Sequence, residues 1–271
     1  MGTAAQDPVV AVLAEEFEAI AQLGDRLSEG DWELPTECPG WSVRDVLSHL
    51  IGVERMLLGD PAPSAPADRP PHVRNDMGAA NEAWVAARRG LGGPEVLAEF
   101  RDVTARRLEQ LGGFPPERFD EIGPTPVGQA PYREFMQVRV MDCWVHEQDI
   151  RVATGRPGHA AGPAAQISLD RIASAMPFIV GKRAGVPDGR GVRFELSGSP
   201  GRRIDVAVRD GRAALRDLET PDTTLEMDAE VFWRLGCGRV NGDAALGAGL
   251  VGVRGDTAIG EQVVRSMAFM I

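Results

Sequence analysis

Apolar residues recur three or four positions apart through the first half of the chain, as they do in helices that bury one face. Asp7 and Pro8 supply a cap and a first-turn proline, and Ser42 with Asp45 forms a capping box ahead of another apolar stripe. Four long helices joined by loops are typical of a helical bundle. The spacing predicts long helices over residues 8–27, 43–57, 95–111 and 132–154, and a further helical region over residues 76–90.

Two proline-rich stretches separate these helices. Five prolines fall between Pro61 and Pro71, and proline and glycine are again frequent from Gly112 to Pro131. Because proline lacks a backbone donor and blocks helix continuation, both stretches are predicted to be loops. The helix after the second loop is expected to end at Gly155. It is expected to turn five apolar residues inward: Phe135, Val138, Met141, Val145 and Ile150.

The pattern changes to alternating apolar and polar residues toward the C-terminus, after a bridging helix over residues 163–183. Asp210 and Gly211 form a strong hairpin-turn signal between two of the alternating segments. The pattern predicts strands over 192–196, 204–208, 212–215, 223–227 and 250–253, and helices over 229–235 and 256–270. The predicted fold class is therefore α+β. Residues 1–160 are expected to form a four-helix bundle, and residues 161–271 the bridging helix and a smaller α+β domain.

Composition and charge narrow the class of protein. The chain has 271 residues, 43% of them hydrophobic, which is enough for two domains with cores of their own. Its 40 acidic and 29 basic residues give a net charge of −11, which disfavours binding to nucleic acid or to an anionic membrane. The N-terminus is acidic where a signal peptide would be basic, and no segment approaches the roughly 20 apolar residues of a membrane span. We expect a cytoplasmic protein, either a monomer or a homodimer.

Three residues form a candidate metal site. Asp142 and His146 are four residues apart on one predicted helix, so their side chains lie one turn apart on the same face. That face overlaps the inward stripe, where a cation would offset the cost of burying a carboxylate. His49 is the other histidine on an inward helical face. Two imidazoles and a carboxylate suit Zn²⁺, with Mn²⁺, Ni²⁺ or Fe²⁺ as further options, and leave a position open for chemistry.

A hydrogen-bonded core role is the alternative for this trio, because an aspartate and a histidine at this spacing are common in helices. Of their neighbours, Asp149 or Glu147 could accept a hydrogen bond from a ligand imidazole, although we expect Glu147 on a solvated helix face. His72 and His159 are expected at the surface. The tryptophans of these helices and loops either line a pocket or pack in the core: Trp32, Trp41 and Trp144.

The chain has three widely spaced cysteines, so neither a disulfide framework nor a thiolate zinc site is indicated. Cys38 and Cys143 lie near the proposed ligands in sequence. Each is expected to be a buried small hydrophobe, with a thiol beside the metal as the alternative. Cys237 lies in the C-terminal domain.

Two segments resemble the mycothiol-dependent maleylpyruvate isomerase family. They are WELPTECPGWSVRDVLSHL at residues 32–50 and RVMDCWVHEQDIR at residues 139–151. The C-terminal glycine-rich segment that ends in GVRGD at Asp256 also looks like the family's second domain. The resemblance implies a DinB-like four-helix bundle that binds a metal, usually zinc, followed by a sterol-carrier-like domain. The matching metal ligands here are His49, Asp142 and His146.

The resemblance implies a metal-dependent enzyme that uses mycothiol as thiol cosubstrate, in an isomerisation or a thiol transfer on an electrophilic small molecule. One departure is that the family pattern has Glu where this chain has Asp142, whose side chain is one methylene shorter. In the isomerase an arginine of the second domain contacts substrate, and three residues are candidates for that role here: Arg203, Arg234 and Arg239.

Two alternatives belong to other functional classes. One is a non-catalytic module with a structural metal, which would bind or regulate through a small molecule. It predicts an apolar cavity in the second domain, lined by residues such as Phe194, Leu225 and Phe232. The other is a metal-dependent hydrolase that uses metal-bound water and needs no thiol.

Overall fold

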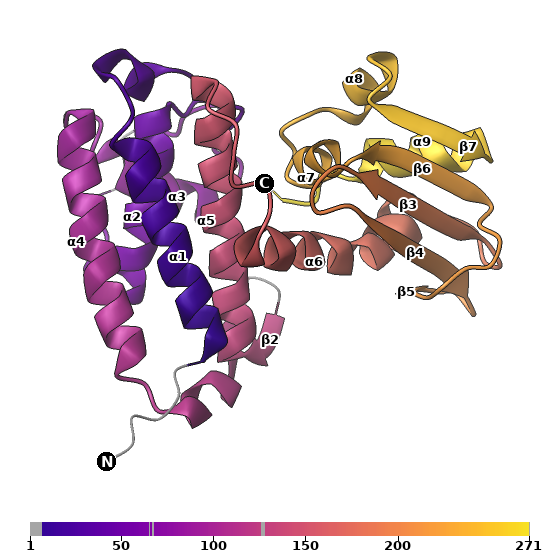
Figure 1. The fold of residues 1–271 in the computed structure, drawn as a ribbon, viewed down its shortest axis with the longest axis horizontal. Coiled ribbons are helices and arrows are strands. Elements are labelled where there is room, and N and C mark those ends of the chain that lie inside the picture. The colour runs from indigo at the N-terminus through magenta and orange to yellow at the C-terminus, as the bar shows by residue number, and fades with distance from the viewer. Residues whose placement is uncertain (1–6, 65, 67, 126–127, 271) are drawn as a thin grey trace. The chain divides into compact units, whose positions relative to one another are not determined.

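The computed structural model describes residues 7–64, 66, 68–125 and 128–270 (Figure 1). The chain divides into two compact units, Met1–His159 and Ala160–Ile271. The first unit is mainly helical, and the second combines helices with a five-stranded sheet. The predicted α+β class, with a helical bundle ahead of a smaller α+β part, is confirmed.

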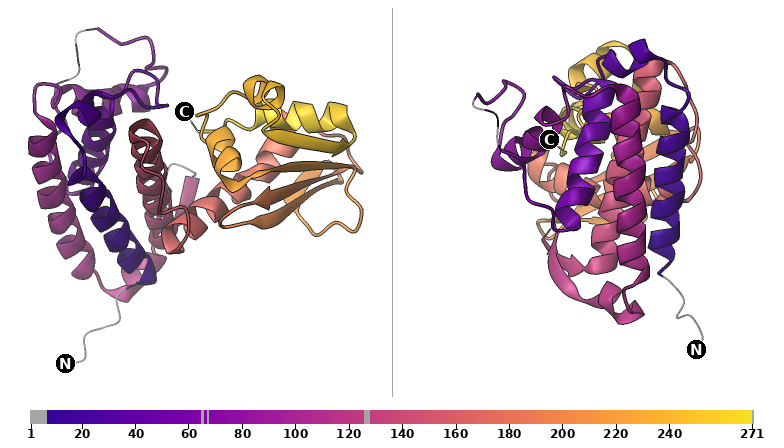
Figure 2. Two further views of the ribbon diagram at one scale, coloured as in Figure 1. Left: turned by 45° about the horizontal axis from the view of Figure 1, so that its top comes forward. Right: turned by 90° about the vertical axis from the view of Figure 1, so that its left-hand side faces the viewer.

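The first unit is built on four long helices: α1 (Pro8–Gly24), α2 (Val43–Leu57), α4 (Gly93–Gly112) and α5 (Tyr132–Thr154). Helix α1 packs against α4 and α5, and α2 packs against the same two helices, so the four enclose one core (Figure 2). A shorter helix, α3 (Asp76–Ala86), packs against α2. Among the helices of the described residues, none combines the length and the apolar character that crossing a membrane requires.

The signals at the helix ends work as predicted. The Asp7 carboxylate accepts a hydrogen bond from the backbone N–H of Val9 at 3.1 Å and caps α1. Ser42 and Asp45 form a reciprocal capping box that starts α2, which satisfies two N–H groups that would otherwise lack partners. Gly155 ends α5 in the left-handed conformation, with φ of 63°.

The stretch from Gly112 to Pro131 is not simply a loop, and in this respect the prediction is wrong. It contains a 3-10 turn, η2 (Pro116–Asp120), and an antiparallel pair of strands, β1 (Ile122–Thr125) and β2 (Gly128–Pro131). Pro115 and Pro116 lie at the start of η2, whereas Pro124 lies within β1 and Pro131 ends β2. An isolated two-stranded sheet tolerates them because each strand has a free edge that needs no ladder donor.

The inward face of α5 also differs from the prediction. Phe135 and Val138 are only half-buried, whereas Met136 and Val140 are completely buried. Apolar residues occupy several faces of this helix, so their spacing alone did not determine its orientation. The other three predicted core positions of α5 are buried: Met141, Val145 and Ile150.

The second unit begins with α6 (Pro163–Phe178), which continues into a π-helical turn, η3 (Ile179–Arg183). Its sheet has the strand order β5-β4-β3-β6-β7, in which only the β3 and β6 pair is parallel. The strands are β3 (Gly191–Ser197), β4 (Arg202–Arg209), β5 (Arg212–Leu215), β6 (Thr223–Asp228) and β7 (Val251–Gly255). The remaining helices are α7 (Ala229–Gly236), α8 (Gly242–Gly247) and α9 (Thr257–Ser266).

The sheet has one apolar and one polar face, as the alternation predicts. Phe194, paired with Ile204 and Leu225, lies on the apolar face, and α6, α7 and α9 pack against the strands (Figure 1). Glu195, paired with Arg203 and Glu226, lies on the other face. The short helix α8 was not predicted, because six residues with a glycine at each end carry little helical periodicity.

Candidate metal centre

The three predicted ligands converge inside the bundle. His49 comes from α2, and Asp142 and His146 come one turn apart from α5, which packs against α2. Both histidines are buried, with 5% and 6% of their surface exposed, whereas the Asp142 side chain keeps 21%. The structure thus brings together residues that are separated by more than half of the first unit's sequence.

The distances within this trio are too long for good hydrogen bonds. Nε2 of His49 lies 3.5 Å from Oδ2 of Asp142, and Nε2 of His146 lies 3.7 Å from Oδ1 of the same carboxylate. Ligands at about 2.0–2.1 Å around one tetrahedral ion are separated by roughly 3.3–3.4 Å. The observed separations are close to that value, and the ligand atoms of all three residues lie within 4.8 Å of one another.

Burial and charge set the protonation of two members of the trio, His49 and Asp142. Burial lowers the pKa of His49 below its ordinary value of 6.5, against the opposing effect of Asp142. Burial alone would raise the pKa of Asp142, but Arg139 and the two imidazoles hold it well below the ordinary 3.8. At neutral pH the site therefore offers a neutral His49 imidazole and an ionised carboxylate, which are the forms that bind metals.

Asp149 fixes the orientation of His146. Its Oδ2 lies 2.9 Å from Nδ1 of His146, so Nε2 is the ring nitrogen that faces Asp142. The Cys38 thiol donates to the same Asp149 oxygen at 3.2 Å and lies 3.9 Å from Nδ1 of His146. A carboxylate behind a ligand imidazole is a common feature of metal sites. Of the two flanking acids, Asp149 therefore occupies the supporting position.

A buried arginine and glutamate network supports Asp142. Arg139 donates to Oδ2 of Asp142 and, through Nε and Nη2, to Oε1 of Glu54 at 2.9 and 2.7 Å. Arg107 donates to the other oxygen of Glu54 at 3.1 Å. Glu54 is completely buried, and Arg107 is 1% exposed. These pairings keep three charges satisfied in the core and hold the Asp142 carboxylate against movement.

Trp41 forms an aromatic wall beside the imidazoles. Its ring centroid lies 5.1 Å from that of His49 and 6.3 Å from that of His146. The indole N–H donates to Oε2 of Glu82 at 3.0 Å, and Nε2 of His72 lies 3.0 Å from the same oxygen. Glu82 on α3 therefore connects the wall to the end of the proline-rich loop.

The donor set fits a divalent cation. Nδ1 of His49 is buried and has no hydrogen-bond partner among the described residues, while its Nε2 faces Asp142. Two imidazoles and one carboxylate are ligands of borderline ions such as Zn²⁺. Asp142, the most exposed of the three, marks the side from which a further ligand could approach.

Three of the other candidates lie where the sequence did not predict them. Glu147 is completely buried and bonded to Arg151 and His159, so the expectation of a solvated position is wrong. His72 and His159 are partly buried, with side-chain exposures of 18% and 28%. Cys143 is buried beside Arg139, as expected, and two of the three candidate tryptophans, Trp32 and Trp144, are core residues.

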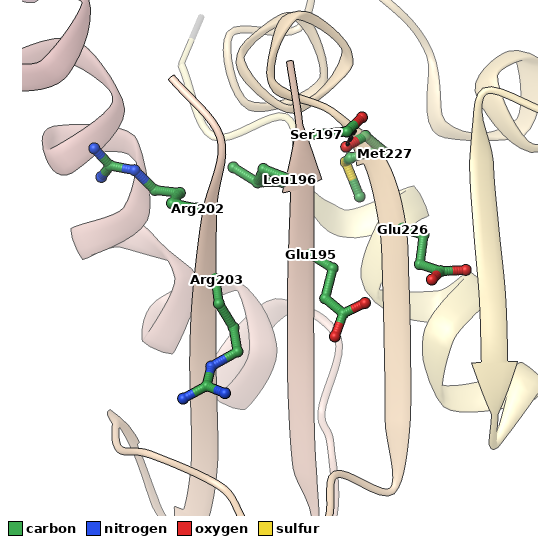
Figure 3. A pocket seen from close by; sticks show the side chains of 7 residues that line it. All are labelled: Glu195, Leu196, Ser197, Arg202, Arg203, Glu226 and Met227. Atoms are coloured by element: carbon green, nitrogen blue, oxygen red, sulfur yellow. Dashed lines mark hydrogen bonds between the residues drawn. The ribbon is translucent and has the colours of Figure 1, made fainter. Parts of the chain in front are cut away.

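The second unit has an open pocket of about 410 Å³ at one end of its sheet, lined by charged side chains (Figure 3). Figure 3 shows Arg203, Glu195 and Glu226 on three adjacent strands. Of the three candidate arginines, only Arg203 lines this pocket. Phe194 and Phe232, named above for an apolar cavity, are completely buried with ring centroids 5.9 Å apart. They fill the space between the sheet and α7.

Several residues around the site were not predicted from the sequence. Glu54 and Arg139 lie on predicted helices, and Glu54 continues the apolar stripe of α2 four residues after Leu50. A charged residue in an apolar stripe was the available signal. Glu82 gave no such signal, because its role depends on a contact between α3 and a distant loop.

Two family descriptions match the chain. Mycothiol maleylpyruvate isomerase N-terminal domain matches residues 13–151, which include all three candidate ligands. MDMPI C-terminal domain matches residues 166–259. Among curated proteins, no sequence matches the chain.

Two solved structures of the mycothiol-dependent maleylpyruvate isomerase share the fold over most of the chain. A crystal structure of the mycothiol-dependent maleylpyruvate isomerase is 14% identical, with a TM-score of 0.55 over 86% of this chain and 88% of that one. A histidine-to-alanine mutant of the isomerase, also 14% identical, has a TM-score of 0.57 over 91% of both chains. Sterol Carrier Protein 2 Like 2 from Aedes aegypti is 15% identical and has a TM-score of 0.31 over 37% of this chain and 96% of its own.

Proposed function

The chain belongs to the mycothiol maleylpyruvate isomerase family, and from this premise we propose that it is a metal-dependent enzyme that uses mycothiol as its thiol. The reaction class is isomerisation or thiol transfer on an electrophilic small molecule. The observation that carries the proposal is the convergence of His49, Asp142 and His146 from two helices, with Nε2 to carboxylate separations of 3.5 and 3.7 Å. A further small molecule would complete the coordination.

The residues around the trio prepare it for this role. The lowered pKa of His49 leaves its imidazole neutral, and the lowered pKa of Asp142 leaves its carboxylate ionised. Asp149 holds His146 with Nε2 toward the site, and Arg139 holds Asp142. A divalent cation held by this trio would supply Lewis acidity, which makes a thiol a nucleophile at neutral pH.

The site is closed on one side by Trp41 and open on the side of Asp142. The indole ring excludes water from one side of the His49 imidazole, which strengthens electrostatic interactions there. The Asp142 side chain remains 21% exposed, so thiol and electrophile would approach past it. This arrangement favours a reaction between two bound molecules over a sealed structural metal site.

The test combines metal content with thiol-dependent activity. The parent and a His49→Ala/His146→Ala variant are prepared without chelators, loaded with zinc and analysed for bound metal. His72→Asn provides a matched control for metal content, because it also removes a histidine from the same unit. Each protein is then assayed for mycothiol-dependent isomerisation of maleylpyruvate, in which the thiol is regenerated, and for consumption of mycothiol with monochlorobimane as electrophile.

We expect the double variant to lose one equivalent of metal and all mycothiol-dependent turnover, with the metal content of His72→Asn equal to that of the parent. Equal metal content in the parent and the double variant would refute the metal site. Metal-dependent hydrolysis without thiol would favour a hydrolase. A bound metal with no turnover of either kind would favour a binding or regulatory module.

A further inference from the structure

A second cluster of ionisable side chains lies in the first unit and plays no part in the proposed reaction. Glu16 on α1, Glu147 on α5 and His159 in the segment after α5 offer ligand atoms that all lie within 4.8 Å of one another. Both glutamates are completely buried, and the His159 side chain is 28% exposed. The cluster therefore joins three separate segments at the edge of the bundle core.

Glu16 is the unsatisfied member of this cluster. Neither of its carboxylate oxygens has a hydrogen-bond partner among the described residues, although the side chain is completely buried. Its Oε2 lies 3.7 Å from Nδ1 of His159, which is beyond hydrogen-bond distance. A buried carboxylate without a donor is costly, so some group must compensate for it.

Glu147 already has its partners. Arg151 lies 2.7 Å from Oε1 of Glu147, and Nδ1 of His159 lies 2.6 Å from Oε2. The backbone carbonyl of His159 accepts a hydrogen bond from the Trp144 indole at 2.9 Å, which holds the histidine in place. The Arg151 guanidinium and the His159 imidazole are thus directed at Glu147, and Glu16 has no donor among the described residues.

We propose that Glu16, Glu147 and His159 form a second divalent-cation site, distinct from the His49, Asp142 and His146 trio. Two carboxylates and an imidazole suit Zn²⁺ or Mn²⁺, and Arg151 would orient Glu147 as Arg139 orients Asp142. A cation here would satisfy both oxygens of Glu16 and replace the hydrogen bond between His159 and Glu147. It would link α1 to α5 and stabilise the first unit.

The competing account is that Glu16 is a neutral acid. Burial, and then the neighbouring Glu147, raise the pKa of Glu16 well above its ordinary 4.5, so a proton could take the place of the cation. The two accounts differ in a measurable way. Only the cation site requires that Glu16 and His159 contribute to metal binding.

The experiment counts bound Zn²⁺ by equilibrium dialysis of the full chain. The parent is compared with Glu16→Gln/His159→Gln, with His49→Ala/His146→Ala, and with Glu15→Gln as a matched control that removes an exposed charge beside Glu16. The unfolding temperature of each protein is measured with and without Zn²⁺. Circular dichroism verifies that every variant is folded.

We expect two equivalents in the parent and in Glu15→Gln, and one in each double variant, with affinity at the altered site reduced on the order of 100-fold or more. Zinc should also raise the unfolding temperature of the His49→Ala/His146→Ala variant. A Glu16→Gln/His159→Gln variant that binds as much zinc as the parent overturns the second site. If metal is lost only in the Glu16→Gln/His159→Gln variant, and not in the His49→Ala/His146→Ala variant, the metal site at the trio is refuted instead. The two proposals therefore fail separately.

Discussion

Oδ2 of Asp149 lies 2.9 Å from Nδ1 of His146, which is one turn earlier on the same helix. The same oxygen accepts a hydrogen bond from the Cys38 thiol at 3.2 Å. The carboxylate therefore determines which nitrogen of His146 faces Asp142. It does so from a completely buried position. The orientation of a proposed ligand thus depends on a residue that does not itself face the trio.

Asp149→Asn should weaken metal binding at the trio while leaving all three proposed ligands present. An amide is a poorer acceptor and can present its N–H₂ group to His146, so the preferred tautomer is lost. We expect an affinity loss of about 10- to 100-fold, measured by competition with a chromophoric zinc chelator. Asp102→Asn, on an exposed side chain of α4, is the matched control. Equal affinities for the two variants would contradict the orienting role.

Glu54→Gln should destabilise the first unit strongly. The change leaves Arg107 and Arg139 without their buried carboxylate, and removing one partner of a buried ion pair costs about 3–5 kcal/mol. Urea unfolding provides the measurement. Glu33→Gln, which neutralises an exposed carboxylate paired with Arg44, should cost less than about 1 kcal/mol. If Glu54→Gln lowers the free energy of unfolding as little as Glu33→Gln does, the network contributes little to stability.

Glu82→Gln should change how stability depends on pH. Burial opposes ionisation of Glu82, but donors from Trp41, His72 and Arg89 outweigh it and lower the pKa below the ordinary 4.5. A carboxyl with a lowered folded-state pKa stabilises the protein above its unfolded-state pKa, and this contribution is lost as the pH falls through the folded-state value. The parent should therefore exceed the variant in unfolding free energy at neutral pH, by a margin that shrinks below pH 4.5.

The control for this measurement is Glu109→Gln, which alters an exposed carboxylate on α4. Its unfolding free energy should follow that of the parent at every pH. A gap between the parent and Glu82→Gln that stays constant through the acid range would assign the effect of Glu82 to packing.

Gly52→Ala should destabilise the contact between α2 and α3. A Cβ at Gly52 would lie 2.4 Å from Cβ of Trp84, which is too close without movement of one helix. The cost of such overpacking is about 1–3 kcal/mol, and calorimetry or urea unfolding would measure it. At Gly90 an added Cβ meets nothing within 4 Å, so Gly90→Ala should change stability by less than about 0.5 kcal/mol. Equal changes in stability for Gly52→Ala and Gly90→Ala would mean that α2 and α3 can move apart without cost.

Local signals in the sequence predicted most of the fold. The Ser42 capping box, the glycine after α5 and the alternation around Asp210 and Gly211 each depend on neighbours in sequence, and the corresponding elements form. The β1 and β2 pair was missed because each of its four-residue strands contains a glycine and a proline, which indicate a loop. Spacing also grouped Asp142 with His146, since a helix places such residues on one face.

What the sequence could not predict depends on contacts between distant segments. Glu16 lies on the first predicted helix and is buried only because α5 and His159 lie against it. Likewise, the support of Trp41 by Glu82 depends on the packing of α3, which periodicity does not determine. Family resemblance identified the proposed ligands but none of these surrounding contacts.

The double use of Glu54 has an evolutionary consequence. Because one carboxylate satisfies both Arg107 and Arg139, replacement at any of the three positions leaves the others uncompensated until they too have changed. Viable intermediates between this arrangement and another should be rare, so the three residues should be inherited together. Diversification among descendants should instead accumulate on side chains that can drift one at a time.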